Sequence, residues 1–113
     1  MSAGATSKKY PTSIVGERSY QPAIFKCVAG QPVTLLRERD NPYDDLAIVV
    51  VCERRATIGY IARDSWLRDA IHDDAKGCRA TIKSIDTGEA GVLGVVLDVE
   101  LCTEPLGSRK FKR

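Results

Sequence analysis

The sequence has no closely spaced pair of cysteines, no long apolar run and few aromatic residues. Its four cysteines, Cys27, Cys52, Cys78 and Cys102, stand far apart, and its only histidine, His72, has no such ligand beside it. Because zinc sites need clustered thiolates and imidazoles, the ligand spacing of such a site is absent. We therefore expect neither a metal nor any other cofactor.

No stretch approaches the roughly 18 apolar residues of a membrane span, and no signal peptide or lipidation motif is visible. We expect a cytoplasmic protein that binds no membrane, with association with the nucleoid as an alternative. The cysteines lie in or beside apolar runs, which suits free core thiols in a reducing compartment. A disulfide pair or an assembled metal site is the alternative.

The chain also lacks a strong excess of charge of either sign. Its formal net charge is only +2, too small for nucleic acid to be held by bulk electrostatics, so any such binding must be local. Basic residues gather toward the ends, which we interpret as flexible basic arms or as solubilising termini that touch nothing. They are Lys8, Lys9, Arg109, Lys110, Lys112 and Arg113.

The chain of 113 residues suits one domain with one core. With 43% hydrophobic but only 6% aromatic residues, that core should consist mainly of Val, Ile, Leu and Ala. We expect a flexible N-terminal tail over residues 1–11, a folded domain over 12–104 and a basic C-terminal tail over 105–113.

Alternating or branched apolar segments bounded by turn residues predict six short strands and a mainly-β barrel, since a sheet of this size must close or be covered. The strands are expected at residues 12–16, 33–37, 46–52, 57–61, 78–85 and 92–102, with a bulge suggested at Gly94. The third is apolar throughout and should be central, whereas residues 23–28 are ambiguous.

One α-helix is predicted after the fourth strand. Asp64 or Ser65 can cap it, and Trp66, Leu67, Ala70 and Ile71 form an apolar stripe. We expect Arg68, Asp69 and Asp73 on its solvent face, His72 near its end and Gly77 as its stop.

The segment from Asp40 to Val50 is the most informative part of the chain. Its turn, Asn41-Pro42-Tyr43-Asp44, leads directly into an apolar strand. Proline fixes its own φ, and Asn and Asp side chains bond to the local backbone, so Tyr43 and Asp44 should face solvent at a preformed strand entrance. The alternative is a plain capped turn whose tyrosine lies at the edge of the core.

Three motifs occur in order: Val15-Gly16 with Tyr20, then Asn41-Pro42-Tyr43-Asp44 with Ala47-Ile48, then Ile58-Gly59-Tyr60-Ile61 with Arg63. In this order and spacing, the region from Thr12 to Cys102 resembles the HIRAN domain. In Swi/Snf-type fork-remodelling ATPases that domain is an OB-like β-barrel that binds the free 3′ end of single-stranded DNA. Small stand-alone bacterial or phage proteins also carry it.

The resemblance implies a role for each matching residue. Tyr43 would stack on a terminal base and Asp44 would accept the 3′-hydroxyl, while Arg18, Asn41 and Arg63 would hold flanking phosphates. Tyr20 and Tyr60 would line the same groove. It also implies a non-catalytic module in DNA repair or at replication forks, with single-stranded DNA 3′ ends as ligand and a separate helicase, ATPase or repair protein as a further partner.

The sequence departs from the remodeller pattern at two positions. Ser19 stands where a second adjacent aromatic is usual, so one stacking surface is missing, and Tyr60 replaces a residue that is often histidine. The alternative function is a non-enzymatic adaptor barrel in a DNA-repair or phage complex. A metal-dependent nuclease would need convergence of Asp40, Asp44, Asp45 and Asp73 or Asp74, which a cluster in sequence does not establish.

Overall fold

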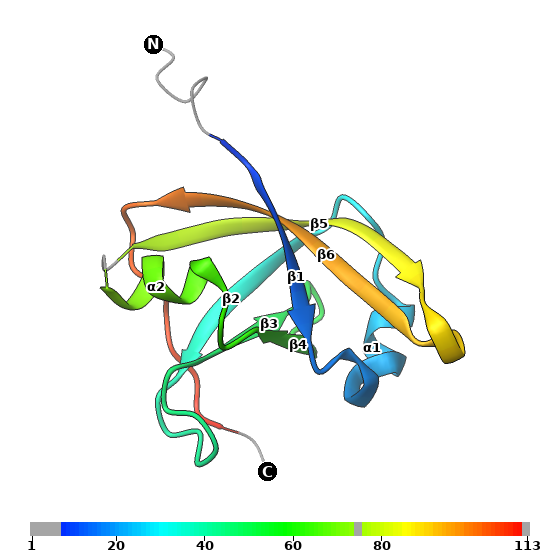
Figure 1. The fold of residues 1–113 in the computed structure, drawn as a ribbon, viewed down its shortest axis with the longest axis horizontal. Coiled ribbons are helices and arrows are strands. Elements are labelled where there is room, and N and C mark those ends of the chain that lie inside the picture. The colour runs from blue at the N-terminus through cyan, green and yellow to red at the C-terminus, as the bar shows by residue number, and fades with distance from the viewer. Residues whose placement is uncertain (1–7, 74–75, 112–113) are drawn as a thin grey trace.

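The computed structural model describes residues 8–73 and 76–111, and six antiparallel strands within them close into a ring (Figure 1). The strands are β1 (Tyr10–Val15), β2 (Pro32–Glu38), β3 (Ala47–Val51), β4 (Thr57–Ile61), β5 (Gly77–Thr87) and β6 (Leu93–Cys102). Around the ring they follow the order β1-β4-β3-β2-β5-β6. The predicted mainly-β barrel of six strands is confirmed. Asp74, Lys112, Arg113 and the first seven residues lie outside the described residues.

The long β5–β6 hairpin organises one side of the barrel. β6 pairs with β5 from Gly77↔Cys102 to Thr87↔Leu93 and with β1 from Tyr10↔Val99 to Ser13↔Val96. This pairing explains why β1 begins two residues earlier than predicted. The register shift lies in β5, between Ile82 and Ser84, and not at Gly94.

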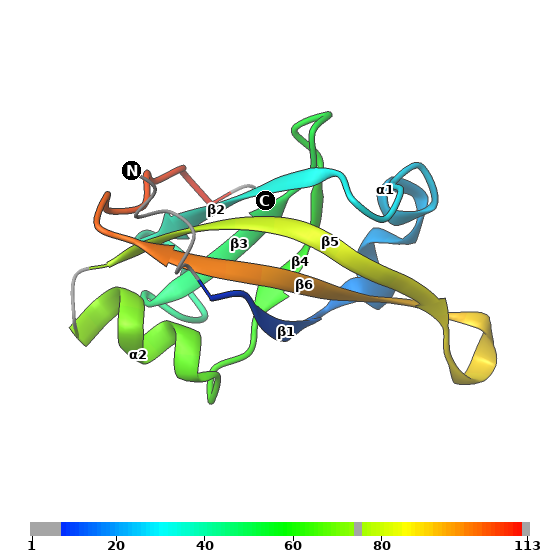
Figure 2. The same cartoon turned by 90° about the horizontal axis from the view of Figure 1, so that it is seen from above.

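The described residues form two α-helices, which lie at opposite ends of the barrel (Figures 1 and 2). Helix α2 (Trp66–Asp73) follows β4 as predicted, and the Ser65 hydroxyl accepts a hydrogen bond from the Leu67 amide at 3.2 Å. A 3-10 turn, η2 (Glu17–Tyr20), precedes a short helix, α1 (Gln21–Phe25), which includes the first part of the ambiguous segment 23–28. The residue expected to stop α2, Gly77, instead begins β5, where a Cβ would overlap the backbone of Glu104.

One face of α2 packs on the barrel, but that face is wider than the sequence indicates. Leu67, Ala70 and Ile71 are buried as expected. Arg68, predicted to face solvent, is also buried, and this prediction was wrong. The cause is not local, since Arg68 forms an ion pair with Asp44 of the β2–β3 loop.

The core fills the inside of the barrel, and its members are aliphatic, as the low aromatic content predicts. The fully buried members include Ile24, Ile48, Val50, Ile58, Leu67, Ile71, Leu97 and Val99. Gly59 is required where β1 crosses β4, because a Cβ there would lie 2.7 Å from Ile14 Cδ1 and 2.8 Å from the Val15 carbonyl oxygen. Strand β3 is buried along its whole length, as predicted for a central strand.

The strand register defines a second layer, on the outside of the barrel. Val15 lies opposite Tyr60, Tyr60 opposite Val49, and Val49 opposite Leu36. Because directly opposed residues of antiparallel strands share a face, these four side chains lie on one surface. Their neighbours in sequence, such as Ile14 and Leu35, belong to the core cluster. The outer face of β1, β4, β3 and β2 therefore carries Val15 and Tyr60, which belong to the first and third sequence motifs.

Residues 107–111, which we call the C-terminal strap, lie along β2. The Arg37 amide donates to the Gly107 carbonyl and the Arg109 amide donates to the Arg37 carbonyl, both at 2.9 Å. Pairing between β2 and β5 ends at Val33, so this edge of β2 has backbone groups free to bond the strap. The basic composition of these residues, from which we expected a flexible arm or a solubilising terminus, gives no sign of this backbone bonding to β2.

All four cysteines are free thiols, as expected, although only Cys52 is fully buried. Burial, with the nearby Cys52, raises the pKa of Cys27 to about 11, and burial raises that of Cys78 to about 12. Both thiols are therefore protonated at neutral pH. No helix in the described part of the chain is long and apolar enough to cross a membrane.

Candidate functional site

The β2–β3 loop is shaped by two side chains that bond to the backbone just after them. Asn41 Oδ1 accepts from the Tyr43 amide at 2.9 Å, and Asp44 Oδ1 accepts from the Leu46 amide at 3.1 Å. Such turns are the local conformation that Asn and Asp favour. They fix the backbone on both sides of Tyr43, so the loop is preformed.

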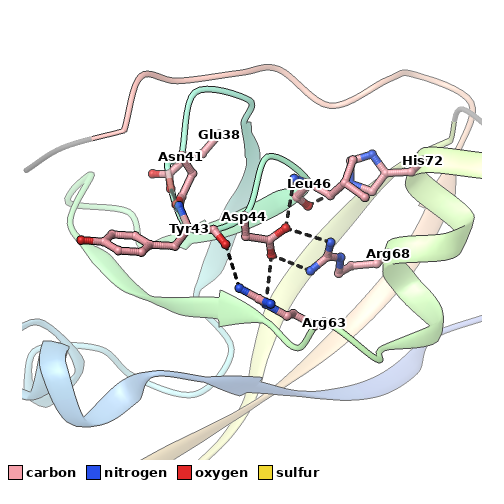
Figure 3. A network of polar contacts seen from close by, with 8 residues as sticks. All are labelled: Glu38, Asn41, Tyr43, Asp44, Leu46, Arg63, Arg68 and His72. Carbon is pink, nitrogen blue, oxygen red and sulfur yellow. Dashed lines mark hydrogen bonds and ion pairs between the residues drawn. The ribbon is translucent and has the colours of Figure 1, made fainter.

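The Tyr43 ring points away from the Asp44 carboxylate and its arginine partners (Figure 3). Tyr43 is 78% exposed, which excludes the alternative in which the ring lies at the edge of the core. Its one aromatic neighbour is Phe111 of the strap, with ring centroids 6.0 Å apart and ring planes at 70°. Most of the ring is therefore open to a ligand.

The Asp44 carboxylate is surrounded by two guanidinium groups (Figure 3). Arg68 donates to both of its oxygens, at 2.7 and 3.2 Å, and Arg63 Nε lies 3.6 Å from Oδ2. The Asp44 side chain nevertheless keeps 18% of its surface exposed. It is thus a half-buried anion that solvent, or a ligand, can still reach.

The protonation state of Asp44 follows from these contacts. Burial alone would raise its pKa, but the hydrogen bonds from Arg68 and Leu46 and the charges of Arg68 and Arg63 outweigh burial and lower the pKa. The carboxyl group is therefore ionised at neutral pH, when it can only accept hydrogen bonds.

A cavity of about 190 Å³ lies between the loop and the outer face of β4. Its lining includes Tyr43, Asp44, Tyr60 and Arg63, together with Val15, Asn41, Ala47 and Ile61. Five of the seven residues singled out in the sequence thus line one cavity. The exceptions are Arg18, which is exposed on η2, and Tyr20, which packs partly against the core.

A buried carboxylate, Glu38, lies behind the cavity. Its Oε1 accepts from the Tyr60 hydroxyl at 2.7 Å and from Asn41 Nδ2 at 3.1 Å, and Arg109 Nε donates to Oε2 at 2.6 Å. Glu38 itself is fully buried. Burial, then the hydrogen bond to Glu38 and its charge, raise the pKa of Tyr60, so this phenol stays neutral and keeps donating to Glu38.

Asn41 is buried as well, and both ends of its amide are engaged within the protein. It joins Glu38 to the backbone of Tyr43. Arg63 Nη2 donates a hydrogen bond to the Tyr43 carbonyl at 2.9 Å, although the Arg63 side chain remains 72% exposed. His72, in the last turn of α2, contacts the end of the β2–β3 loop, where its Nε2 lies 3.0 Å from the Leu46 carbonyl oxygen.

Four residues of this region were missed in the sequence: Glu38, Arg68, Arg109 and Phe111. The pattern of apolar residues along β2 did not mark Glu38 as a site residue, and Arg68 was predicted to face solvent. Glu38 is the one carboxylate in a strand of apolar and neutral residues beside Arg37, which is the only sequence signal that could have indicated a buried charge. Arg109 and Phe111 reach the site through the strap, which no local pattern predicts.

Two of the acidic residues that a nuclease would use, Asp40 and Asp44, are engaged within the protein. Asp44 is paired with arginines, and Asp40 Oδ1 accepts from the Phe111 amide at 2.9 Å. Within the described ranges, 8–73 and 76–111, no group of three or more His, Cys, Asp or Glu side chains could hold a metal ion.

Comparisons with known proteins support the motif assignment. The model of the HIRAN domain family matches residues 10–100. A crystal structure of a protein from Lactobacillus plantarum is similar, with a TM-score of 0.60 and 25% identity, and covers 84% of this chain and 97% of that one. The HIRAN domain of human HLTF has a TM-score of 0.60 and 19% identity over 86% of this chain and 78% of that one, which shows a shared fold. No curated protein matches significantly.

The family match runs from the first strand into the last and includes the loop that carries Tyr43 and Asp44. It covers most of the barrel and all seven residues singled out in the sequence. This chain therefore belongs to the HIRAN domain family, which is known for DNA-binding modules.

Proposed function

We propose that this protein binds the free 3′ end of single-stranded DNA, with the terminal nucleotide in the cavity between the β2–β3 loop and β4. One observation carries the proposal: an ionised, partly exposed carboxylate, Asp44, lies in the same cavity as an exposed aromatic ring, Tyr43. A phosphate chain would be repelled by the carboxylate, whereas a strand terminus offers a hydroxyl.

The ring supplies affinity that does not depend on sequence. Stacking of a base on an aromatic side chain contributes about 1–3 kcal/mol, and every base has a face that can stack. The Tyr43 ring is open, and its backbone is fixed by Asn41 and by Arg63, so little conformational entropy is lost on binding. Tyr60 lines the cavity from β4.

The carboxylate supplies selectivity for a hydroxyl. An ionised carboxylate has about four acceptor positions. Asp44 uses three of them for Arg68 and the Leu46 amide, and Arg63 Nε is too far from Oδ2, at 3.6 Å, for a hydrogen bond. The fourth position, on Oδ2, suits the 3′-hydroxyl donor.

The arginines offset the carboxylate's repulsion of the phosphates. Arg63 is largely exposed and Arg18 is exposed on η2, next to β4. Guanidinium groups fit phosphate oxygens with two parallel hydrogen bonds. Asn41, which is buried, contributes by fixing the loop.

The proposal is tested by competition among three oligonucleotides of one sequence: one with a 3′-hydroxyl, one with a 3′-phosphate and one circular. We expect the 3′-hydroxyl form to bind most tightly, since a charged hydrogen bond contributes about 1.5–3 kcal/mol. Equal affinity for the three forms would refute end recognition.

An adaptor function would rest on a different surface. Phe25 of α1 is 81% exposed and the nearby Val28 is 59% exposed, and both lie outside the cavity. DNA binding that falls steeply with salt favours the proposed function, because phosphate contacts release counterions.

A further inference from the structure

The C-terminal strap is attached to the site at three points. Its backbone bonds to Arg37 hold it along β2, and the Phe111 amide donates to Asp40 Oδ1 at 2.9 Å. The third point is the Arg109 side chain, which reaches Glu38. The position of Phe111 beside the loop is therefore determined by the fold.

The same buried carboxylate holds the strap and the cavity. One oxygen of Glu38 binds Arg109, and the other binds Asn41 and Tyr60. The Arg109 side chain is itself only 15% exposed. Because a buried charge requires its partner, Arg109 of the strap stabilises the same carboxylate that Asn41 and Tyr60 of the cavity bind.

Phe111 extends the aromatic surface that Tyr43 begins. The rings meet edge to face, so the contact leaves Tyr43 largely exposed while a second ring stands beside it. Two rings at a steep angle cannot both stack on one base, but they can contact successive bases of a strand that turns as it leaves the cavity.

Basic side chains lie beside Asp40, the residue that binds the Phe111 amide. A cavity of about 380 Å³ is lined by Arg39, Asp40, Ser108, Arg109 and Lys110. Arg39 and Lys110 are exposed, and neither forms an ion pair with another described residue. Asp40 and Arg109 are engaged by Phe111 and Glu38, so Arg39 and Lys110 are the cations available to a phosphate.

We propose that the strap forms a second wall of the binding site and takes the nucleotide that precedes the terminal one. This inference rests on the proposed end-binding function. Phe111 contacts the penultimate base, and Lys110 and Arg39 contact the phosphate that joins the two nucleotides. The strand then leaves the site over the strap.

The test is the dependence of affinity on ligand length. Thymidine 5′-phosphate and oligothymidylates of two, three and four nucleotides, all with a free 3′-hydroxyl, are titrated against the wild type, Phe111→Ala and Lys110→Ala. A matched control is Phe25→Ala, which removes an exposed aromatic ring from α1.

We expect the wild type to gain affinity at the second nucleotide. Phe111→Ala should reduce that gain by about 5- to 150-fold, the equivalent of about 1–3 kcal/mol of stacking, and leave the mononucleotide unaffected. Lys110→Ala should lower the slope of log affinity against log salt by about one for every ligand in the series, because thymidine 5′-phosphate already carries the phosphate that Lys110 contacts. Phe25→Ala should bind like the wild type.

Two results would overturn the inference while the proposed function stands. Phe111→Ala binds every length as the wild type does, or it weakens every length by one factor, although Tyr43→Ala still reduces binding of 3′-hydroxyl ends. Failure of the wild type to distinguish a 3′-hydroxyl from a 3′-phosphate refutes the proposed function itself. Thermal unfolding of each variant separates a loss of contact from a loss of fold.

Discussion

Glu38 and Asp44, the carboxylates on either side of Tyr43 in the chain, lie in opposite surroundings. Glu38 is fully buried and bound by three side chains, from the loop, β4 and the strap. Asp44 is held by Arg68 and the loop backbone, yet part of its surface lines an open cavity. Glu38 therefore has no hydrogen-bond acceptor that a ligand can reach, whereas Asp44 keeps one acceptor position open to a ligand.

The difference suggests separate tasks for the carboxylate at the end of β2, Glu38, and the carboxylate in the β2–β3 loop, Asp44. Glu38 connects segments far apart in sequence, so its removal should alter the shape of the site and the stability of the barrel. Asp44 keeps part of its carboxylate exposed beside two arginines, so its removal should alter which ligand binds. The variants below test whether the two carboxylates can be separated in this way.

The largest effect on stability is expected from Arg109→Met, which removes the cation paired with Glu38. Removing one partner of a buried ion pair leaves an uncompensated charge and costs about 3–5 kcal/mol. We expect the free energy of unfolding, measured with urea, to fall by that amount. The double variant Glu38→Gln with Arg109→Met buries no charge and should recover most of the loss; a single-variant loss below about 1 kcal/mol would contradict this role of Glu38.

Tyr43→Ala should show the reverse pattern, with a change in binding and none in stability. The ring is exposed, so the free energy of unfolding should change by less than about 0.5 kcal/mol. Binding of single-stranded DNA should weaken by about 1–3 kcal/mol. Phe25→Ala, which removes an equally exposed ring, is the control, and equal losses in both variants would mean that the loop has no special role.

The pH dependence of stability tests the ion pairs of Asp44. The pKa of Asp44 in the folded protein lies below its ordinary value of 3.8. Its contribution to stability is therefore complete above that value and is lost as the pH falls through the lowered pKa. Asp44→Asn should make urea unfolding less dependent on pH below about pH 4; parallel curves for variant and wild type would show that Arg68 and Arg63 do not stabilise the charge.

The smallest effect is expected at Arg18, which does not line the cavity. If it contacts one phosphate, Arg18→Ala should weaken binding of all sequences alike and lower the salt slope by about one. Fluorescence anisotropy at several salt concentrations measures that slope. An unchanged slope would restrict the interface to the loop and the strap.

The sequence predicted the elements whose patterns are local. The six strands and α2 follow from apolar periodicity, and β4 was predicted with its observed bounds. The outward position of Tyr43 followed from Asn41 and Pro42, whose effects on the backbone act within a few residues.

Contacts between distant segments were not predicted. Arg68 looked like a surface residue on α2 because its partner, Asp44, lies 24 positions earlier in the chain. Arg109 and Phe111 looked like part of a solvated tail, because the edge of β2 that receives the strap exists only after the barrel has closed. Composition contains no information about that edge.

The most direct test of the account measures how strongly the protein prefers a 3′-hydroxyl over a 3′-phosphate, in the wild type and in Asp44→Asn. The wild type should favour the hydroxyl by about 1.5–3 kcal/mol, and the variant should lose the preference while it still binds the strand through Tyr43. An equal preference for the 3′-hydroxyl in both proteins would show that Asp44 does not recognise that group.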